Sequence, residues 1–140
     1  MHIDEIARNL PALFAALLVS ILFIQSSLDK VFDWKGNRDW LTGHFSKTFL
    51  APMVPVMLAT VTLMELVTGF LAAAGLVYFF VDGSLRIIFY ASLVGTLSLT
   101  ALFFGQRVAK DYPGAAVLVP YFILMILLIY LTNPFLPPVK

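Results

Sequence analysis

Cysteine is absent from this chain of 140 residues. Without thiols the protein forms no disulfide bond, no thiol redox relay and no iron–sulfur cluster. It also lacks the thiolate ligands of structural zinc sites and the cysteines that attach c-type haem. Any redox chemistry associated with this chain must therefore use a cofactor that is not held by cysteine.

Charged residues are scarce as well. Lys, Arg, Asp and Glu make up 12% of the chain and hydrophobic residues 61%, whereas soluble domains carry about 25% charged residues. So few charges cannot coat a water-soluble fold, and the mean hydropathy is +0.95. The formal net charge of +1 cannot supply the basic surface that phosphate backbones require. The composition therefore excludes an ordinary soluble domain and a nucleic-acid-binding protein.

Hydrophobic residues instead gather in four long runs. A membrane-spanning helix needs about 20 apolar residues, and the four runs of about this length cover residues 12–30, 53–81, 85–106 and 115–132. These spans and their connections leave no room for a soluble domain. We therefore predict an all-α fold, an integral membrane four-helix bundle with up-down topology. Residues 1–140 form a single transmembrane domain, in which residues 31–52 are a long loop.

Basic residues are unevenly distributed between the two ends of this bundle. Four spans place both termini on one side, and that side holds three cations, Arg8, Arg86 and Lys140. The loop side holds six, which are Lys30, Lys35, Arg38, Lys47, Arg107 and Lys110. Cytoplasmic loops are enriched in Lys and Arg. We therefore expect a bacterial cytoplasmic (inner) membrane protein whose termini lie on the non-cytoplasmic side.

Glu65 is the single charge inside the second run. A carboxylate there costs at least about 2.5–3.5 kcal/mol unless it is paired or neutralised. Its helical neighbours Thr62, Gly69 and Ala72 are small or carry a hydroxyl, so this face admits another helix and points into the bundle. Two interpretations stay open. Glu65 accepts a proton, pairs with a cation or binds a polar headgroup, or it is a protonated carboxyl that only stabilises the bundle.

A polar cluster ends the first run. Gln25 and Asp29 lie one helical turn apart, and Lys30 follows directly. If the helix ends are level, Glu65 lies about 15 Å deeper than Lys30, and a lysine side chain reaches only about 6 Å. We therefore expect Gln25 or a water molecule to bridge the two charges. The alternative is that Lys30 extends to the membrane interface beside a solvated acid.

Further polar and aromatic groups lie near the predicted interfaces. Trp34 and Trp40 belong to the long loop, and tryptophan is typical of the membrane boundary. Arg86, at the start of the third span, is a candidate for binding an anionic headgroup. His44 lies outside the hydrophobic runs, and the sequence contains no catalytic motif or set of metal ligands. We predict no catalytic residue and no metal site, and we expect an accessory subunit rather than a stand-alone enzyme.

Two segments resemble a known family. Residues 25–33, with the sequence QSSLDKVFD, are similar to the end of the first helix in DoxX-like membrane proteins, where a small residue precedes a lysine and an apolar pair. Residues 64–72, with the sequence MELVTGFLA, resemble the second helix of that family, where a glutamate precedes a glycine and a run of small residues. Ser27 stands where many members have glycine. The resemblance implies a small four-helix membrane protein with Lys30 and Glu65 as candidate site residues.

The resemblance also implies a role in membrane redox chemistry, because the family is named after a membrane subunit of a thiosulfate:quinone oxidoreductase. We therefore expect a subunit that anchors or supports a quinone-linked assembly. Its expected partners are membrane lipids and other membrane protein subunits, without nucleic acid. The expected ligand at Glu65 is a quinone or a lipid, and no cofactor is covalently bound. One alternative is a purely structural accessory subunit of a larger complex, and another is a small transporter or proton-path protein.

Overall fold

The computed structural model describes residues 2–136, so Lys140, one of the cations counted above, lies outside the described residues. Every regular element in this range is helical. In chain order the helices are α1 (Ile3–Arg8), α2 (Leu10–Phe32), α3 (Trp34–His44), the 3₁₀ helix η1 (Ala51–Met53), α4 (Val54–Asp82), α5 (Arg86–Val108) and α6 (Tyr112–Thr132). Helices α2, α4, α5 and α6 are long and apolar enough to cross a membrane, which confirms the predicted all-α bundle.

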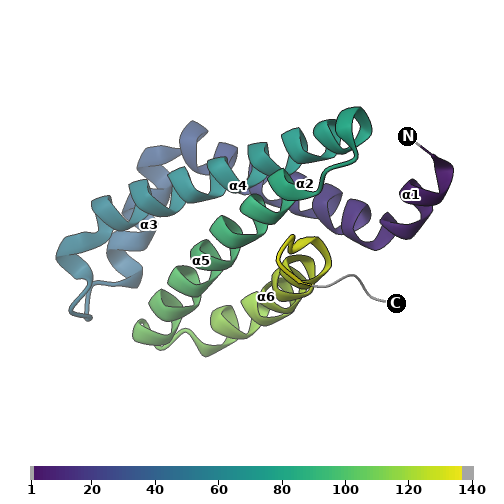
Figure 1. Cartoon of the computed structure of the whole chain (residues 1–140). Coiled ribbons are helices and arrows are strands. Elements are labelled where there is room, and N and C mark those ends of the chain that lie inside the picture. The colour runs from purple at the N-terminus through teal and green to yellow at the C-terminus, as the bar shows by residue number, and fades with distance from the viewer. Residues whose placement is uncertain (1, 137–140) are drawn as a thin grey trace.

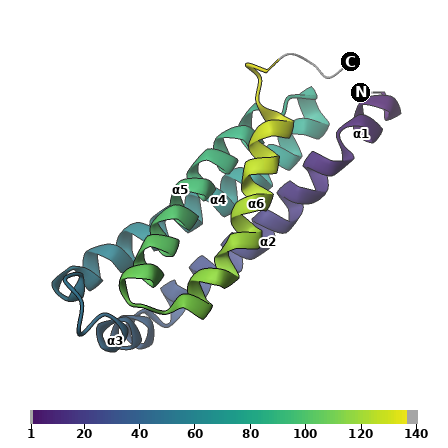
Figure 2. The ribbon, with the colours of Figure 1, turned by 90° about the horizontal axis from the view of Figure 1, so that it is seen from below.

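Consecutive long helices lie side by side and run in opposite directions. Ile24 of α2 lies against Gly69 of α4, and Lys30, further along α2, lies against Glu65, earlier in α4. Helix α4 also packs on α5, α5 packs on α6, and α6 returns to α2 (Figure 1). Figure 2 shows α1 and the end of α6 at one end of the bundle and α3 at the opposite end.

Glycines set the closest approaches between these helices. A Cβ atom on Gly69 would lie 2.7 Å from the backbone nitrogen of Ile24, and one on Gly75 would lie 2.8 Å from that of Ile88. Real Cβ atoms do not approach backbone so closely, so only glycine permits these contacts. Small residues play this role at helix interfaces in membranes. The two contacts therefore fix the registers of α2 on α4 and of α4 on α5.

The register makes α4 extend past α2 at the α3 end of the bundle. The contact of Gly69 with Ile24 places the first residue of α2, Leu10, level with the last turn of α4. Helix α4 contains 29 residues and α2 contains 23, so α4 protrudes by about 9 Å at 1.5 Å per residue. The segment that contains α3 covers this protruding part, where Phe45 packs with Val54.

Residues 31–52, predicted as a loop, contain helix α3. The side chain of Asp33 accepts a hydrogen bond from the backbone nitrogen of Gly36 at 3.3 Å, which caps the helix at its N-terminus. Helix α3 has 11 residues with a polar composition, WKGNRDWLTGH. The prediction of a loop is therefore wrong for residues 34–44, because a search for long hydrophobic runs cannot detect a short polar helix.

Candidate functional site

Lys30 and Glu65 form an ion pair inside the bundle. Lys30 Nζ lies 3.0 Å from Glu65 Oε2, and the two side chains are 20% and 3% exposed. Ser26 joins the pair, because its hydroxyl donates to Glu65 Oε2 at 3.1 Å and accepts from Lys30 Nζ at 2.9 Å. Lys30 also donates a longer bond of 3.4 Å to the carbonyl oxygen of Ser26. The carboxylate that the sequence places in the apolar region is thus compensated by a direct cation.

This direct contact corrects the expectation that Gln25 or water bridges the two charges. The expectation assumed level helix ends, whereas α4 begins about 9 Å beyond the end of α2. Lys30 in the last turn of α2 is therefore within about one helical turn of Glu65, which lies eleven residues into α4, and this distance is within the reach of a lysine side chain. The alternative of a lysine extended to the interface is also wrong, because Nζ turns inward to the carboxylate.

The other predicted residues of the polar cluster do not join the pair. Gln25 and Asp29 are exposed and line a shallow groove on the outer face of α2. Ser26 takes the place that the sequence analysis assigned to Gln25. The signal for Ser26 was its position one turn before Lys30, because residues four apart lie on the same face of a helix.

Thr62 lies on the same buried face of α4 as Glu65, as predicted from its spacing, and is 4% exposed. Its Oγ1 atom has no hydrogen-bond partner within residues 2–136. The hydroxyl of Ser98 on α5, which is fully buried, also lacks a partner in this range. Ser98 has no functional signal in the sequence, because serine on a small-residue face is common at helix interfaces in membranes.

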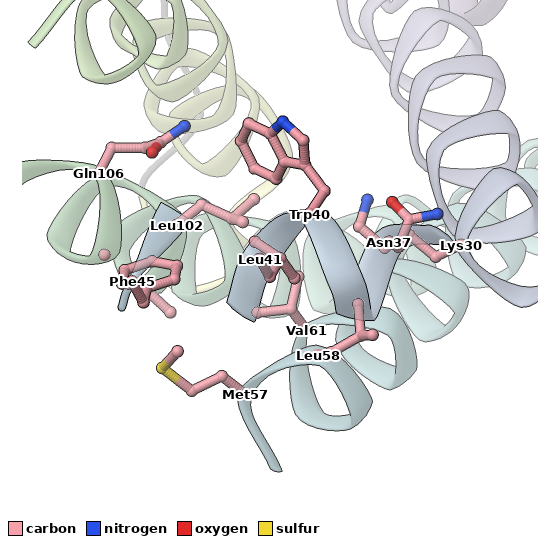
Figure 3. A pocket seen from close by; sticks show the side chains of 12 residues that line it. Lys30, Asn37, Trp40, Leu41, Phe45, Met57, Leu58, Val61, Leu102 and Gln106 are labelled. Carbon is pink, nitrogen blue, oxygen red and sulfur yellow. The ribbon is translucent and has the colours of Figure 1, made fainter. Parts of the chain in front are cut away.

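A cavity of about 270 Å³ lies beside the ion pair, between α3, α4 and α5. Lys30, Asn37 and Gln106 supply its polar groups. Its apolar lining consists of Trp40, Leu41, Phe45, Met57, Leu58, Val61, Ala101, Leu102 and Gly105. Figure 3 shows Lys30 and Asn37 at one side of the cavity and Gln106 at the other, with residues of α3 between them. One wall of the cavity is therefore formed by the segment that was predicted to be a loop.

His44 fastens the end of α3 to α5. Its Nε2 atom lies 2.8 Å from Gln106 Oε1, so the imidazole donates this hydrogen bond. The same nitrogen lies 3.7 Å from a carboxylate oxygen of Asp111, and the ring stacks on Trp40 with centroids 4.5 Å apart. Since Trp40 and Gln106 both line the cavity, this contact holds two of its walls together.

The predicted interface residues lie near the two ends of the bundle. Trp34 is half-buried and Trp40 is exposed, although one of its faces lines the cavity. Arg86 is exposed at the first position of α5, at the end of the bundle opposite α3. It is therefore remote from the ion pair. No group of three His, Cys, Asp or Glu side chains within the described residues is arranged to hold a metal ion.

Comparisons with protein-family models, with curated protein sequences and with solved structures find no match for this chain. The likeness of residues 25–33 and 64–72 to DoxX-like proteins therefore stays a prediction.

Proposed function

We propose that this chain is a small membrane subunit of a quinone-linked redox assembly, and that its cavity receives the headgroup of a quinone or a lipid. The observation that carries the proposal is that Lys30 belongs to a buried ion pair and also lines an apolar cavity. Ionisable residues within membrane spans are costly and typically mark functional pathways or ligand sites. The likeness to DoxX-like proteins supports the redox context.

The charges around the cavity favour an uncharged headgroup. Glu65 already compensates Lys30 at 3.0 Å, so an anionic ligand would meet the carboxylate and a cationic ligand would meet the ammonium group. The bond from Lys30 to the Ser26 carbonyl is long, 3.4 Å, and a ligand oxygen can replace it at the usual distance. A headgroup with carbonyl oxygens as acceptors suits this end of the cavity.

The opposite side of the cavity offers a second donor. Gln106 accepts the bond from His44 through Oε1; its amide nitrogen lies beside Gly114 and would reach a ligand in the cavity by turning about the side-chain bonds. Trp40 and Phe45 supply flat apolar surface on the α3 side. A planar ring with an acceptor oxygen at each end matches these groups, and this is the chemistry of a benzoquinone. The volume of about 270 Å³ lies just below the usual range for ligand pockets, about 300–1,000 Å³, so the site suits a headgroup whose tail remains outside.

We also propose that α3 and the cavity face the cytoplasm of a bacterium. With Lys30 assigned to the site, five cations remain at this end of the bundle: Lys35, Arg38, Lys47, Arg107 and Lys110. At the other end the described residues include two, Arg8 and Arg86. The excess of cations therefore persists without Lys30, and it supports termini on the non-cytoplasmic side.

The ligand part of this proposal is tested by fluorescence quenching. The chain contains two tryptophans, so Trp34→Phe leaves Trp40 at the cavity as the single reporter. In detergent micelles, a decyl-substituted benzoquinone should quench Trp40 with saturation, and Lys30→Met should weaken this binding at least tenfold. Asp29→Asn, one residue away on the exposed face of α2, is the matched control and should leave it unchanged. Quenching that is linear, or equal in the Lys30 variant, would refute the site.

The assembly part is tested by native purification in mild detergent, followed by mass spectrometry of proteins and lipophilic molecules. Stoichiometric recovery of a redox enzyme supports the proposed subunit. Recovery of a quinone or of a lipid with an uncharged headgroup, lost in Lys30→Met, identifies the natural ligand, whereas recovery of a phospholipid would contradict the preference for an uncharged headgroup. Recovery of this chain alone, without any partner protein, would contradict a role as a subunit.

A second candidate, a purely structural accessory subunit, is favoured by the outer face of α6. This helix is the least buried of the four spans, and it presents a continuous apolar surface that includes Val119, Phe122, Ile123, Ile126 and Leu127. Such a surface suits lipid or a neighbouring helix. Substituting this surface should then release partner subunits, and no quinone should bind at Lys30, whereas the first proposal predicts quinone binding that depends on Lys30.

A further inference from the structure

Hydroxyl side chains within the spans usually bond to their own helix. Serine and threonine commonly donate to a backbone carbonyl three or four residues earlier, which satisfies the hydroxyl in an apolar environment. In this protein the hydroxyls that do so are those of Ser27, Thr68, Ser92, Thr96, Thr100 and Thr132. Thr62 and Ser98 are the exceptions among the described hydroxyls whose oxygen atom is fully buried; Ser20 is also a buried residue, but its oxygen is not fully enclosed.

The two exceptional hydroxyls lie at the depth of the ion pair. A Cβ atom on Gly95 would lie 2.8 Å from Thr68 Cγ2, so these two residues are level on antiparallel helices. Glu65 lies three residues before Thr68 on α4, and Ser98 lies three residues after Gly95 on α5. Because the two helices are antiparallel, Glu65 and Ser98 are therefore also level with each other. Thr62 lies one turn from Glu65 on the same buried face of α4.

The carboxylate of Glu65 also retains hydrogen-bonding capacity. Ser26 and Lys30 both donate to Oε2, and no described residue donates to Oε1. An ionised carboxylate has about four lone-pair sites, and a buried group left without partners costs about 1–3 kcal/mol. Two buried oxygens without partners, Thr62 Oγ1 and Ser98 Oγ, therefore lie within about one helical turn of a carboxylate that can accept further hydrogen bonds.

We propose that this layer of the bundle is an internal hydration site, in which bound water bridges the hydroxyls of Thr62 and Ser98 to Glu65 Oε1. Buried water characteristically makes about three hydrogen bonds to polar groups that would otherwise lack partners. A metal cation is disfavoured, because the ammonium group of Lys30 lies 3.0 Å from the same carboxylate. A headgroup in the cavity is a separate ligand, because neither Thr62 nor Ser98 lines that cavity.

The hydration site gives Glu65 a solvent-like neighbour inside the membrane. Water on Oε1 would give this oxygen a donor, as Ser26 and Lys30 do for Oε2. Leu58 and Val61, one turn from this layer, line the cavity. The water therefore lies one helical turn deeper than the headgroup site, on the side of the carboxylate. This inference holds whether or not a quinone binds, since it rests on the interior oxygens alone.

The proposal is tested by removing each hydroxyl while keeping the size of the side chain. If Thr62 binds water that also bonds Glu65, Thr62→Val should lower the midpoint of unfolding in mixed micelles, and so should Ser98→Ala. Because both hydroxyls contact the same water, the double variant should lose less than the sum of the two losses. Thr68→Val and Ser92→Ala are the matched controls, because those hydroxyls bond to their own helix, and they should shift the midpoint little.

The opposite sign would overturn the proposal. Removing a buried hydroxyl that has no hydrogen-bond partner stabilises the protein. A raised unfolding midpoint in Thr62→Val or Ser98→Ala would therefore mean that no water is bound there. Isotope-edited infrared spectra supply a readout that does not depend on unfolding. The carboxylate band that Glu65→Gln removes should shift in Thr62→Val and stay in place in Thr68→Val. An unshifted band in Thr62→Val would also refute the hydration site.

Discussion

Replacing Lys30 with Met should destabilise the bundle strongly, because it leaves the buried carboxyl group of Glu65 without its cation. At the observed separation of 3.0 Å, the attraction between the charges is about 5–6 kcal/mol with an effective dielectric constant of about 20. Part of this is offset by the desolvation of both groups. Removing one member of a buried pair typically costs about 3–5 kcal/mol, and we expect a loss in this range, because Glu65 is 3% exposed and cannot reach solvent.

The reciprocal variant should be milder. In Glu65→Gln the unpaired ammonium group of Lys30 is 20% exposed and borders the cavity, where it can turn toward water. We expect a loss of about 1–3 kcal/mol. The double variant should lose less than Lys30→Met alone, because it contains no isolated buried charge. The coupling between the two substitutions should therefore reach about 2 kcal/mol.

Reversible unfolding of the four proteins in mixed micelles, followed by circular dichroism, measures this coupling. Asp29→Asn controls for the loss of a charge from the same helix turn and should change stability by less than about 0.5 kcal/mol. Additive losses in the double variant, or an unchanged stability of Lys30→Met, would show that the two charges do not interact in the folded protein.

Three further outcomes follow from local geometry. Gly69→Ala should lower the free energy of unfolding by about 1–3 kcal/mol, because its Cβ would meet the backbone of Ile24 at 2.7 Å. Gly43→Ala is the control: its Cβ would meet nothing within 4 Å, so it should stabilise α3 by about 0.5–1 kcal/mol. His44→Phe keeps an aromatic ring but loses the bond to α5, so hydrogen exchange in α3 should accelerate while the long helices remain protected; equal protection of α3 would contradict the fastening role. Lys110 has φ of 60°, so Lys110→Gly should raise the melting temperature by relieving a cost of about 1 kcal/mol, and a lowered melting temperature would contradict that strain.

The sequence by itself determined the membrane bundle. Four hydrophobic runs and a scarcity of charge leave a chain no alternative to spanning helices, because every backbone polar group in lipid must be bonded internally. The sequence also determined that Glu65 faces the interior, since small residues surround it on one helical face. These inferences depend on composition and on the period of a helix, and both are local properties of the chain.

The tertiary structure decided which group meets Glu65. Depth along a helix can be counted from sequence, but the offset between two helices depends on where they touch, and here Gly69 against Ile24 sets it. That contact brings Lys30 and Ser26 to the carboxylate and leaves Gln25 outside. The cavity, the position of α3 and the layer that joins Ser98 to Glu65 likewise depend on contacts between distant segments, which no local pattern encodes.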